Sequence, residues 1–260
     1  MTRSPEQLAQ IAFEVASEAA QLLLTGFRRH PAVHEKARAD LVTEFDLASE
    51  RLIRQRLAER TPELSIVGEE QGGTPALGRD LTWYCDPLDG TTNFVHGHFF
   101  FCVSLGVGEA GMPVAGAVVA PALGTHWLGW QGGPALRNGE SCRVSETREL
   151  GQALVATGFP SDRSQAASNN FAAFCNVKRQ VRGVRRCGSA AIDLCLVADG
   201  TYDAYWERRL NAWDVMAGSA LVLAAGGMLS ALDGTRPDLS VGHLLASNGL
   251  VHGDLLNLID

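Results

Sequence analysis

Two carboxylates, a glycine and two hydroxyls are concentrated in one short segment of the chain, Asp86-Pro87-Leu88-Asp89-Gly90-Thr91-Thr92-Asn93-Phe94. The apolar run 81–85 predicts a strand that delivers Asp86, and Pro87 and Gly90 then favour a sharp turn. Such a turn lets Asp86 and Asp89 converge on one point, with consecutive backbone N–H groups and hydroxyls just beyond them. Carboxylates are ligands for a hard cation, and consecutive N–H groups bind an anion. The segment predicts adjoining cation and anion sites; the alternative is a turn whose acids serve only turn chemistry.

The spacing of these acids argues against a haloacid dehalogenase-type phosphatase. That class uses D-x-D-G-T, with one residue between the two acids, whereas two residues separate Asp86 from Asp89. The other D-G-T of the chain, which begins at Asp233, lacks the first aspartate. The class also needs a later lysine, and the only lysines of the chain are Lys36 and Lys178.

Three further acids lie at the predicted boundaries of regular elements. Glu69 follows a short predicted strand in Gly68-Glu69-Glu70, where adjacent carboxylates repel each other unless one faces a cation. Asp214 precedes an apolar helix of small residues at an N-cap position, where the helix dipole favours a carboxylate. Asp46 opens another helix. Each acid has an ordinary alternative, a solvated loop for Glu69 and a helix cap for the other two, and their joint placement favours a metal site.

The hydrophobic spacing predicts the elements that position these acids. In an approximate first half, 1–150, we expect helices over 4–27 and 46–60 and strands over 65–67, 81–85, 99–107, 114–120 and 125–131. Leu47, Leu52, Ile53 and Leu57 are expected on one side of the second helix. In the second half, 151–260, we expect strands over 153–157 and 202–206 and helices over 166–175, 190–198 and 215–225. Because no repeat or linker separates the halves, residues 1–260 are predicted to form a single catalytic domain.

Composition narrows the class of protein further. With 29 acidic and 22 basic residues the net charge is −7, which argues against a nucleic-acid-binding protein. No apolar run approaches the ~18–20 residues of a membrane span, and residues 1–14 lack the pattern of a secretory signal. The six cysteines form no C-x-x-C pair, so reduced thiols in a cytoplasmic protein are expected. Cys85 is expected on the face of its strand opposite to Asp86.

These stretches resemble the inositol monophosphatase family, the magnesium-dependent, lithium-sensitive sugar-phosphate phosphatases. Four match in the family's order: Leu41-Val42-Thr43-Glu44-Phe45-Asp46, Gly68-Glu69-Glu70, the nine residues from Asp86 to Phe94, and Trp213-Asp214-Val215-Met216-Ala217-Gly218. A fifth, Gly188-Ser189-Ala190-Ala191, is similar to the family's substrate loop. The match spans nearly the whole chain, and the nine-residue motif is highly specific. The resemblance implies an α+β fold layered as α/β/α/β/α, and relatives that are often dimers, so a homodimer is expected.

The resemblance also implies roles for individual residues. The metal ligands would be Glu69, Asp86, Asp89, Asp214 and the backbone carbonyl of Leu88, holding two or three Mg²⁺ ions. Asp46 and Thr91 would orient the attacking water, and no covalent phosphoenzyme is needed. The phosphate would be held by Gly90, Thr91 and Thr92. The substrate alcohol would face Gly188, Ser189, Ala190 and Glu207.

The choice of substrate rests on groups outside the phosphate site. The family includes enzymes for inositol phosphates, fructose 1,6-bisphosphate, 3′-phosphoadenosine 5′-phosphate and histidinol phosphate. We expect myo-inositol monophosphate, because Glu207 and the small residues 188–191 fit a polyol ring. Histidinol phosphate is the main alternative, with Glu207 or Asp193 facing its amine. Arg185 and Arg186 either meet a second anionic group or form a solvated basic face. The non-enzyme alternative is a metal-binding regulatory protein of the same fold.

Overall fold

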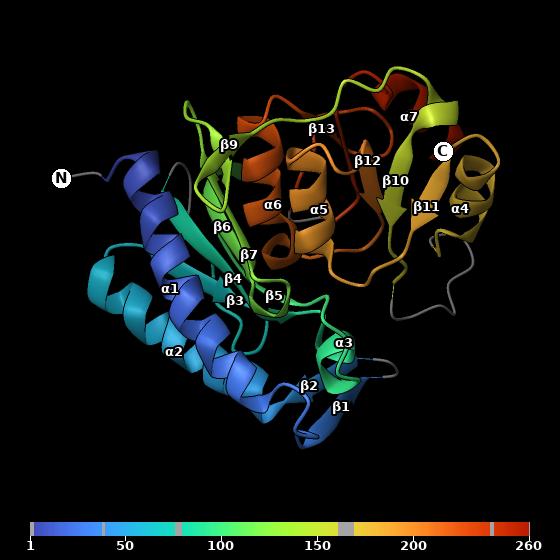
Figure 1. Cartoon of the computed structure of the whole chain (residues 1–260). Coiled ribbons are helices and arrows are strands. Elements are labelled where there is room, and N and C mark those ends of the chain that lie inside the picture. Colours follow the sequence, from blue (N-terminus) through green and yellow to red (C-terminus); the bar gives the residue numbers. More distant parts are fainter. Residues whose placement is uncertain (1–2, 38–39, 76–79, 161–168, 240–241, 260) are drawn as a thin grey trace.

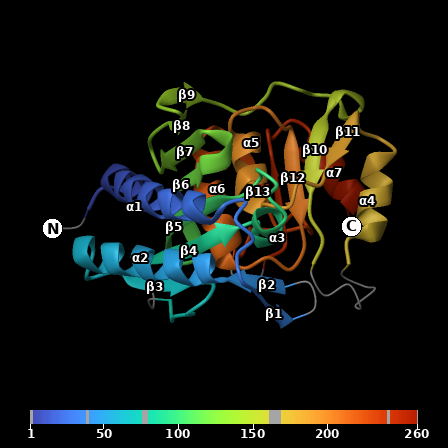
Figure 2. The same cartoon turned by 60° about the horizontal axis from the view of Figure 1, so that its bottom comes forward.

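The computed structural model describes residues 3–37, 40–75, 80–160, 169–239 and 242–259. Five layers follow one another across the molecule (Figure 1). They are α1 (Pro5–Gly26) with α2 (Glu44–Arg60), a seven-stranded sheet, α5 (Ala190–Ala198) with α6 (Ala212–Ala224), a five-stranded sheet, and α4 (Phe171–Lys178) with α7 (His252–Ile259). Figure 2 shows α1 and α2 side by side on the outer face of the larger sheet. This order confirms the predicted α/β/α/β/α layering.

The larger sheet carries the first acidic segment. Its strands follow the order β3 (Ser65–Gly68), β4 (Leu81–Asp89), β5 (Cys102–Glu109), β6 (Met112–Ala120), β7 (Thr125–Trp130), β8 (Ala135–Arg137) and β9 (Glu140–Cys142). Strands β3 and β4 are parallel and the other neighbours are antiparallel. On β4, Trp83 and Cys85 pack in the core under α1 and α2, whereas Tyr84 packs in the core around α5 and α6. Because side chains alternate along a strand, Asp86 lies on the side of α5 and α6, opposite to Cys85 as predicted.

The smaller sheet completes the second half of the chain. Its strands follow the order β11 (Gly183–Arg185), β10 (Leu154–Thr157), β12 (Ala204–Glu207), β14 (Leu244–Ser247) and β13 (Met228–Ser230). Strand β10 is parallel to both of its neighbours, and the remaining pairs are antiparallel. The hairpin of β1 (Val33–Ala37) and β2 (Asp40–Thr43) precedes α2, and the short helix α3 (Thr91–Val95) follows β4. Single 3₁₀ turns, η1 (Pro121–Leu123) and η2 (Leu150–Gln152), lie at connections.

A row of glycines lets α6 approach the larger sheet closely. Gly106 of β5 pairs with Gly116 of β6, which in turn pairs with Gly129 of β7. A Cβ atom on Gly106 would lie 2.5 Å from the backbone nitrogen of Ala217, and one on Gly116 would lie 2.6 Å from its Cα. At Gly106 and Gly116 the helix backbone therefore rests directly on the strands, whereas Gly129 faces the side chains of Leu221 and Ala224.

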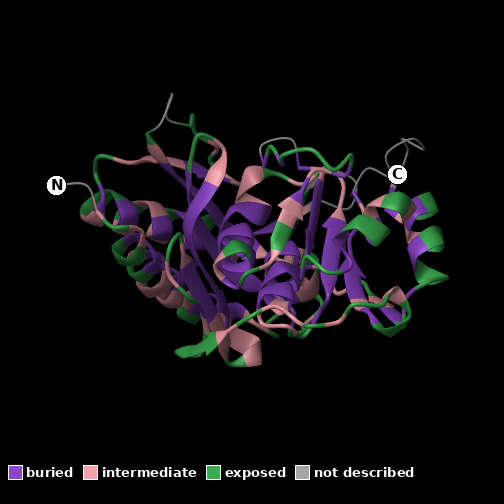
Figure 3. Cartoon of the chain, turned by 90° about the horizontal axis from the view of Figure 1, so that it is seen from above, coloured by how far each residue is buried: buried purple, intermediate pink, exposed green. Residues whose placement is uncertain are grey.

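The opposite side of α6 is packed just as closely. A Cβ atom on Gly218 would lie 2.5 Å from the Cβ of Leu194 on α5. Burial is continuous through this central layer and the strands on either side of it (Figure 3). Asp214 lies in the first turn of α6. The close packing of α6 on both sides therefore fixes the position of this acid.

Several predicted boundaries are wrong. Helix α2 begins at Glu44 because Thr43 caps it, and α6 begins at Ala212 with Asn211 as its N-cap. Asp214 is therefore the third residue of α6, where its side chain accepts the N–H of Asn211. Leu47, expected with the buried residues of α2, is 38% exposed. The helix predicted over 166–175 corresponds to α4, which begins later; residues 161–168 lie outside the described residues.

All six cysteines are free thiols, as the sequence predicts. Burial raises the pKa of the Cys142 thiol to about 11, so this thiol is protonated at neutral pH. In the part of the chain that is described, no helix combines the length and the hydropathy needed to cross a membrane.

We expect Gly116→Ala to lower the free energy of unfolding by about 1–3 kcal/mol, because the new methyl group must displace the backbone of α6. Urea denaturation measures the change. Gly151→Ala is the matched control, since nothing lies within 4 Å of the Cβ it would add. Equal stabilities of the two variants would contradict the close packing of α6.

Candidate active site

The turn after β4 is shaped by the first of the predicted acids. The strand pairing shifts between Asp86 and Asp89, and Oδ1 of Asp86 accepts the N–H of Leu88 at 3.0 Å. Gly90 then adopts a left-handed conformation with φ of 92°, and α3 begins. A Cβ atom on Gly90 would lie 2.9 Å from the carbonyl oxygen of Phe100 and 3.3 Å from that of Gly188. The turn thus needs glycine for its backbone angle and for its close contact with the second half of the chain.

The four acids predicted to bind metal lie within electrostatic reach of one another. Burial raises the pKa of Asp86 well above its ordinary value, and the charges of Glu69, Asp89 and Asp214 raise it further. Burial also raises the pKa of Asp89 and Asp214, and the charges of Glu69 and Asp89 add to the shift of Asp214. Segments that are far apart in the sequence therefore bring their carboxylates into one neighbourhood, where each makes the ionisation of the others more costly.

The donors of this cluster suit a hard cation. The four acids offer only carboxylate oxygens, and Mg²⁺ and Ca²⁺ prefer oxygen ligands. Among the described residues, no three acidic, histidine or cysteine side chains already form a compact coordination shell. The chemistry of the donors fits a divalent cation, and binding one would relieve the repulsion among them.

Asp89 is fixed by the N-terminus of α5. Its Oδ2 accepts hydrogen bonds from the Ser189 hydroxyl and from the backbone N–H of Ala191, both at 2.7 Å. The thiol of Cys102 lies 3.9 Å from the same oxygen. The side chain of Ser189, predicted to face the substrate alcohol, is thus engaged with an acid of the cluster.

Asp46 and Thr91 are hydrogen-bonded to each other. Asp46 is fully buried, and its Oδ2 accepts the backbone N–H of Thr43 at 2.8 Å and the Thr43 hydroxyl at 2.5 Å. The Thr91 hydroxyl lies 3.0 Å from Oδ1 of Asp46 and 3.0 Å from the carbonyl oxygen of Leu88, and it can donate to either. Burial raises the pKa of Asp46, against the opposing effect of these hydrogen bonds. The pair can hold a proton next to the acid cluster.

A cavity of about 150 Å³ opens beside the cluster. It is lined by Asp89, Thr157, Gly158, Arg186, Gly188, Ser189, Ala190, Asp193, Glu207, Leu210 and Asp214. All four residues predicted to face the substrate alcohol are among them. Two larger hollows, of about 360 and 710 Å³, are lined by other residues, and no acid of the cluster borders either. Two acids of the cluster, Asp89 and Asp214, therefore border the same cavity as the predicted substrate residues.

Glu207 is the carboxylate of this cavity that belongs to the smaller sheet. Burial raises its pKa to about 7, and the Tyr205 hydroxyl donates a hydrogen bond to it. A Cβ atom on Gly158 would lie 1.8 Å from Oε2 of Glu207. The carboxylate therefore lies directly against the backbone of Gly158, a contact that requires glycine.

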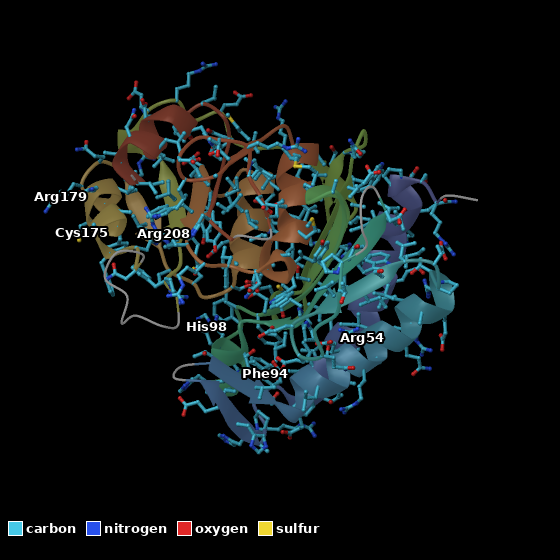
Figure 4. All side chains as sticks on the ribbon, turned by 180° about the vertical axis from the view of Figure 1, so that it is seen from behind. Arg54, Phe94, His98, Cys175, Arg179 and Arg208 are labelled. Carbon is cyan, nitrogen blue, oxygen red and sulfur yellow. The ribbon has the colours of Figure 1, made fainter. Side chains whose placement is uncertain are left out.

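Asn93 joins the two halves of the site, a role that the sequence did not reveal. Its amide lies 2.6 Å from the carbonyl oxygen of Phe100 and 2.9 Å from that of Cys187. These contacts tie α3 to the loop that precedes α5; Phe94 and His98, labelled in Figure 4, mark the position of α3 and the segment after it. The position of Asn93 within the nine-residue motif was the available signal.

Glu50 supports the loop that carries Glu69, and it too was missed. Its carboxylate is fully buried and accepts the backbone N–H groups of Glu70 and Gln71 at 2.7 and 3.1 Å. It also forms an ion pair of 2.7 Å with Arg54, which lies along α2 (Figure 4). Glutamate four residues before arginine on a helix ordinarily indicates a surface pair, so the spacing alone concealed this role.

Comparison with known proteins agrees with this arrangement. The model of the inositol monophosphatase family matches residues 4–259. The chain is 40% identical to an inositol-1-monophosphatase of Synechocystis over 95% of this chain and 86% of that one. It is 37% identical to the Nus factor SuhB of Pseudomonas aeruginosa over 98% of this chain and 96% of that one. The solved inositol monophosphatase of Anabaena superposes with a TM-score of 0.89 at 38% identity, covering 97% of this chain and 95% of that one.

The acid cluster predicts a metal-dependent stability with a definite pH dependence. The folded-state pKa values of Asp86, Asp89 and Asp214 are raised, so in a chelator the folded protein binds more protons than the unfolded chain. The stability that these groups contribute is present below the ordinary carboxyl pKa of about 4 and is lost as the pH rises above it. We expect the gain in Tm caused by millimolar Mg²⁺ to grow between about pH 5 and pH 8. Thermal melts with Mg²⁺ and with chelator measure it.

Asp86→Asn tests the origin of this gain. It removes one of the repelling charges, so we expect its Tm in chelator to be no lower than that of the wild type, and the gain with Mg²⁺ to be lost. Glu140→Gln is the control, because it makes the same chemical change at an exposed position on β9. A wild type that gains nothing from Mg²⁺, or an Asp86→Asn variant that gains as much as the wild type, would contradict the metal site.

Proposed function

The chain belongs to the inositol monophosphatase family, and from this membership we propose that it is a Mg²⁺-dependent phosphatase of polyol phosphate monoesters, with myo-inositol monophosphate as its substrate. The observation that carries the proposal is the hydrogen bond between Thr91 and Asp46 beside the cluster of buried carboxylates. A cation site adjoining a pair that can accept a proton is what the hydrolysis of a phosphate monoester requires.

The proposed metal ligands are Glu69, Asp86, Asp89, Asp214 and the carbonyl oxygen of Leu88, for two or three Mg²⁺ ions. When bound, Mg²⁺ lowers the pKa of a coordinated water and neutralises charge that develops on the phosphoryl and leaving oxygens. The family's dependence on metal and the oxygen-only donor set support this assignment.

Thr91 and Asp46 would manage the proton of the attacking water. The Thr91 hydroxyl donates to Oδ1 of Asp46, so a lone pair of its oxygen can accept a hydrogen bond from water. As water loses its proton, Thr91 accepts it and can pass its own proton to Asp46. The bonds from Thr43 to the other oxygen of Asp46 keep the carboxylate oriented for this task.

The remaining predicted residues would hold the substrate. The backbone N–H groups of Gly90, Thr91 and Thr92 would bind the phosphate where α3 begins, since the first N–H groups of a helix lack intrahelical partners. Glu207 would accept hydrogen bonds from hydroxyls of the alcohol, and the backbone of Gly188, Ser189 and Ala190 would form the adjoining wall. Gly188, Ser189, Ala190 and Glu207 line one cavity, which supports the assignment of these four residues.

Other activities are to be separated by experiment. Histidinol phosphate is the main alternative substrate, followed by fructose 1,6-bisphosphate and 3′-phosphoadenosine 5′-phosphate. A metal-binding regulatory protein is the non-enzyme alternative, and one relative is named as a Nus factor. The presence of the Thr91–Asp46 pair favours the enzyme. Inhibition by lithium and a homodimer remain predictions from the family resemblance, and a cytoplasmic location remains a prediction from the cysteine pattern and the first residues of the sequence.

A phosphate-release panel at fixed Mg²⁺ tests the proposed function. We expect the highest kcat/KM with myo-inositol 1-phosphate, lower values with histidinol phosphate, fructose 1,6-bisphosphate and 3′-phosphoadenosine 5′-phosphate, and no release in chelator. Preference for histidinol phosphate would transfer the assignment to that substrate. Absence of release from every ester, in a protein that still binds Mg²⁺, would favour the regulatory protein.

Thr91→Val tests the proton pathway, because valine keeps the shape of threonine without its hydroxyl. We expect kcat to fall about 10²- to 10⁴-fold, the range for loss of general acid–base assistance. Thr91→Ser is the matched control, since it keeps the hydroxyl and should retain most of the activity. Similar kcat values for the wild type and Thr91→Val would remove Thr91 from the mechanism.

A further inference from the structure

Asp193 of α5 is a buried acid, one oxygen of which lacks a hydrogen-bond partner in the described part of the chain. It is 2% exposed, and its Oδ1 has no partner among the described residues. The other buried side-chain atoms without a partner in that part of the chain are the hydroxyl oxygens of Ser104 and Ser219, so Asp193 is the acid of the set. A buried carboxylate is normally paired or hydrogen-bonded, so this one calls for a partner that the described residues do not provide.

Asp203 is a buried acid whose two carboxylate oxygens both have hydrogen-bond partners, and it serves as a comparison for Asp193. It is 5% exposed, and its two oxygens accept hydrogen bonds from the Ser145 hydroxyl and from the backbone N–H of Leu154. These contacts anchor the segment before β10 and the start of β12. Because Asp203 is satisfied by the chain and Asp193 is not, a purely structural role does not account for Asp193.

The surroundings of Asp193 indicate where its partner comes from. Asp193 lines the cavity of about 150 Å³ together with Gly188, Ala190 and Glu207, the proposed wall for the substrate alcohol. It projects from α5, whereas Glu207 belongs to β12, so two carboxylates from different elements border one small space. The charge of Glu207 raises the pKa of Asp193, which is consistent with the two groups bordering the same cavity.

One positive charge, that of Arg186, stands among the four carboxylates that line this cavity. Arg186 borders the same cavity, and its positive charge acts on both Asp193 and Glu207. This guanidinium offsets part of the negative charge of the two carboxylates, so a cationic substrate group is not required next to them. A hydroxyl group donates a hydrogen bond to a carboxylate without adding positive charge next to Arg186.

We propose that Asp193 is a specificity-determining residue that accepts a hydrogen bond from a hydroxyl of the substrate alcohol, next to the hydroxyl received by Glu207. The pair selects phosphate monoesters of polyols with neighbouring free hydroxyls over esters of simple alcohols. This inference rests on the proposed phosphatase function, whose failure would appear in the wild type.

The experiment compares wild type, Asp193→Asn and Asp193→Ala with two substrates, myo-inositol 1-phosphate and 4-nitrophenyl phosphate, which offers no hydroxyl. For Asp193→Ala we expect kcat/KM with inositol phosphate to fall about 10- to 100-fold, mainly through KM, as for loss of a hydrogen bond to a charged group. Asp193→Asn keeps an acceptor oxygen and should lose less. Both variants should keep the wild-type value with 4-nitrophenyl phosphate and the wild-type Kd for Mg²⁺, measured by calorimetry.

Thermal melts separate this role from a structural one. Asp193→Asn removes a buried charge without a partner, so its Tm should be no lower than that of the wild type, whereas Asp203→Asn should lower Tm. The proposal is overturned if Asp193→Ala leaves the inositol phosphate kinetics unchanged, or if the values for both substrates fall in parallel. It is also overturned if the loss appears with histidinol phosphate and not with inositol phosphate. A wild type that hydrolyses no ester would instead overturn the proposed function.

Discussion

Mutual repulsion among buried carboxylates is the constraint on which the arrangement of this molecule depends. The charges of Asp89 and Asp214 raise the pKa of Asp86, the charge of Asp89 raises that of Asp214, and an ionised group in such a buried place is costly. Each gives one oxygen to a backbone N–H group, of Leu88, Ala191 and Asn211 respectively. The chain itself therefore holds the acids in position, and a bound cation would supply the compensating charge.

The acids are held in position by the close packing of the elements that carry them. The glycine row of β5, β6 and β7 sets the depth of α6, and hence of Asp214. The side chain of Asn93 connects the turn that carries Asp89 to the loop before α5. A backbone N–H group in the first turn of α5 donates a hydrogen bond to Asp89. Side chains of loops play little part in this framework. Main-chain hydrogen bonds, and the close approaches that glycine allows, help to position the acids. Such contacts keep their geometry better than long side chains do.

The sequence predicted the layers and the acids better than the contacts between them. Motifs identified Asp86, Asp89 and Asp214 because turn residues and element boundaries have local signatures. The predicted bounds of α1 and α5 were correct almost to the residue, although only α1 buries one face through a regular spacing and nearly every residue of α5 is buried. Hydrophobic spacing grouped Leu47 with Leu52, Ile53 and Leu57 on one side of α2, but Leu47 is 38% exposed, and α2 buries polar residues such as Glu50. The short strands β8, β9, β11 and β13 were also missed, since three residues carry no readable period.

The partners of the acids were beyond sequence analysis for a different reason. Asn93, Glu50 and Asp193 differ from ordinary surface residues only through neighbours that lie distant in the chain. Asn93 reaches Cys187, ninety-four positions away. Burial of Glu50 depends on the loop after β3 folding over α2. A single sequence names the residues of such pairs, but it does not show which residues far apart in the chain lie close together in space.

Helix capping and a role in the proposed site are compatible interpretations of Asp46 and Asp214, because one side chain can serve both. Each is the third residue of its helix and returns a hydrogen bond to the N-cap backbone, of Thr43 and Asn211. One oxygen completes the capping box, and in Asp46 the other receives the Thr91 hydroxyl. The cap thus fixes the orientation of the carboxylate that the site uses. It follows that asparagine, which keeps an acceptor oxygen for the cap, separates the electrostatic role of these acids from their structural one, whereas alanine removes both together.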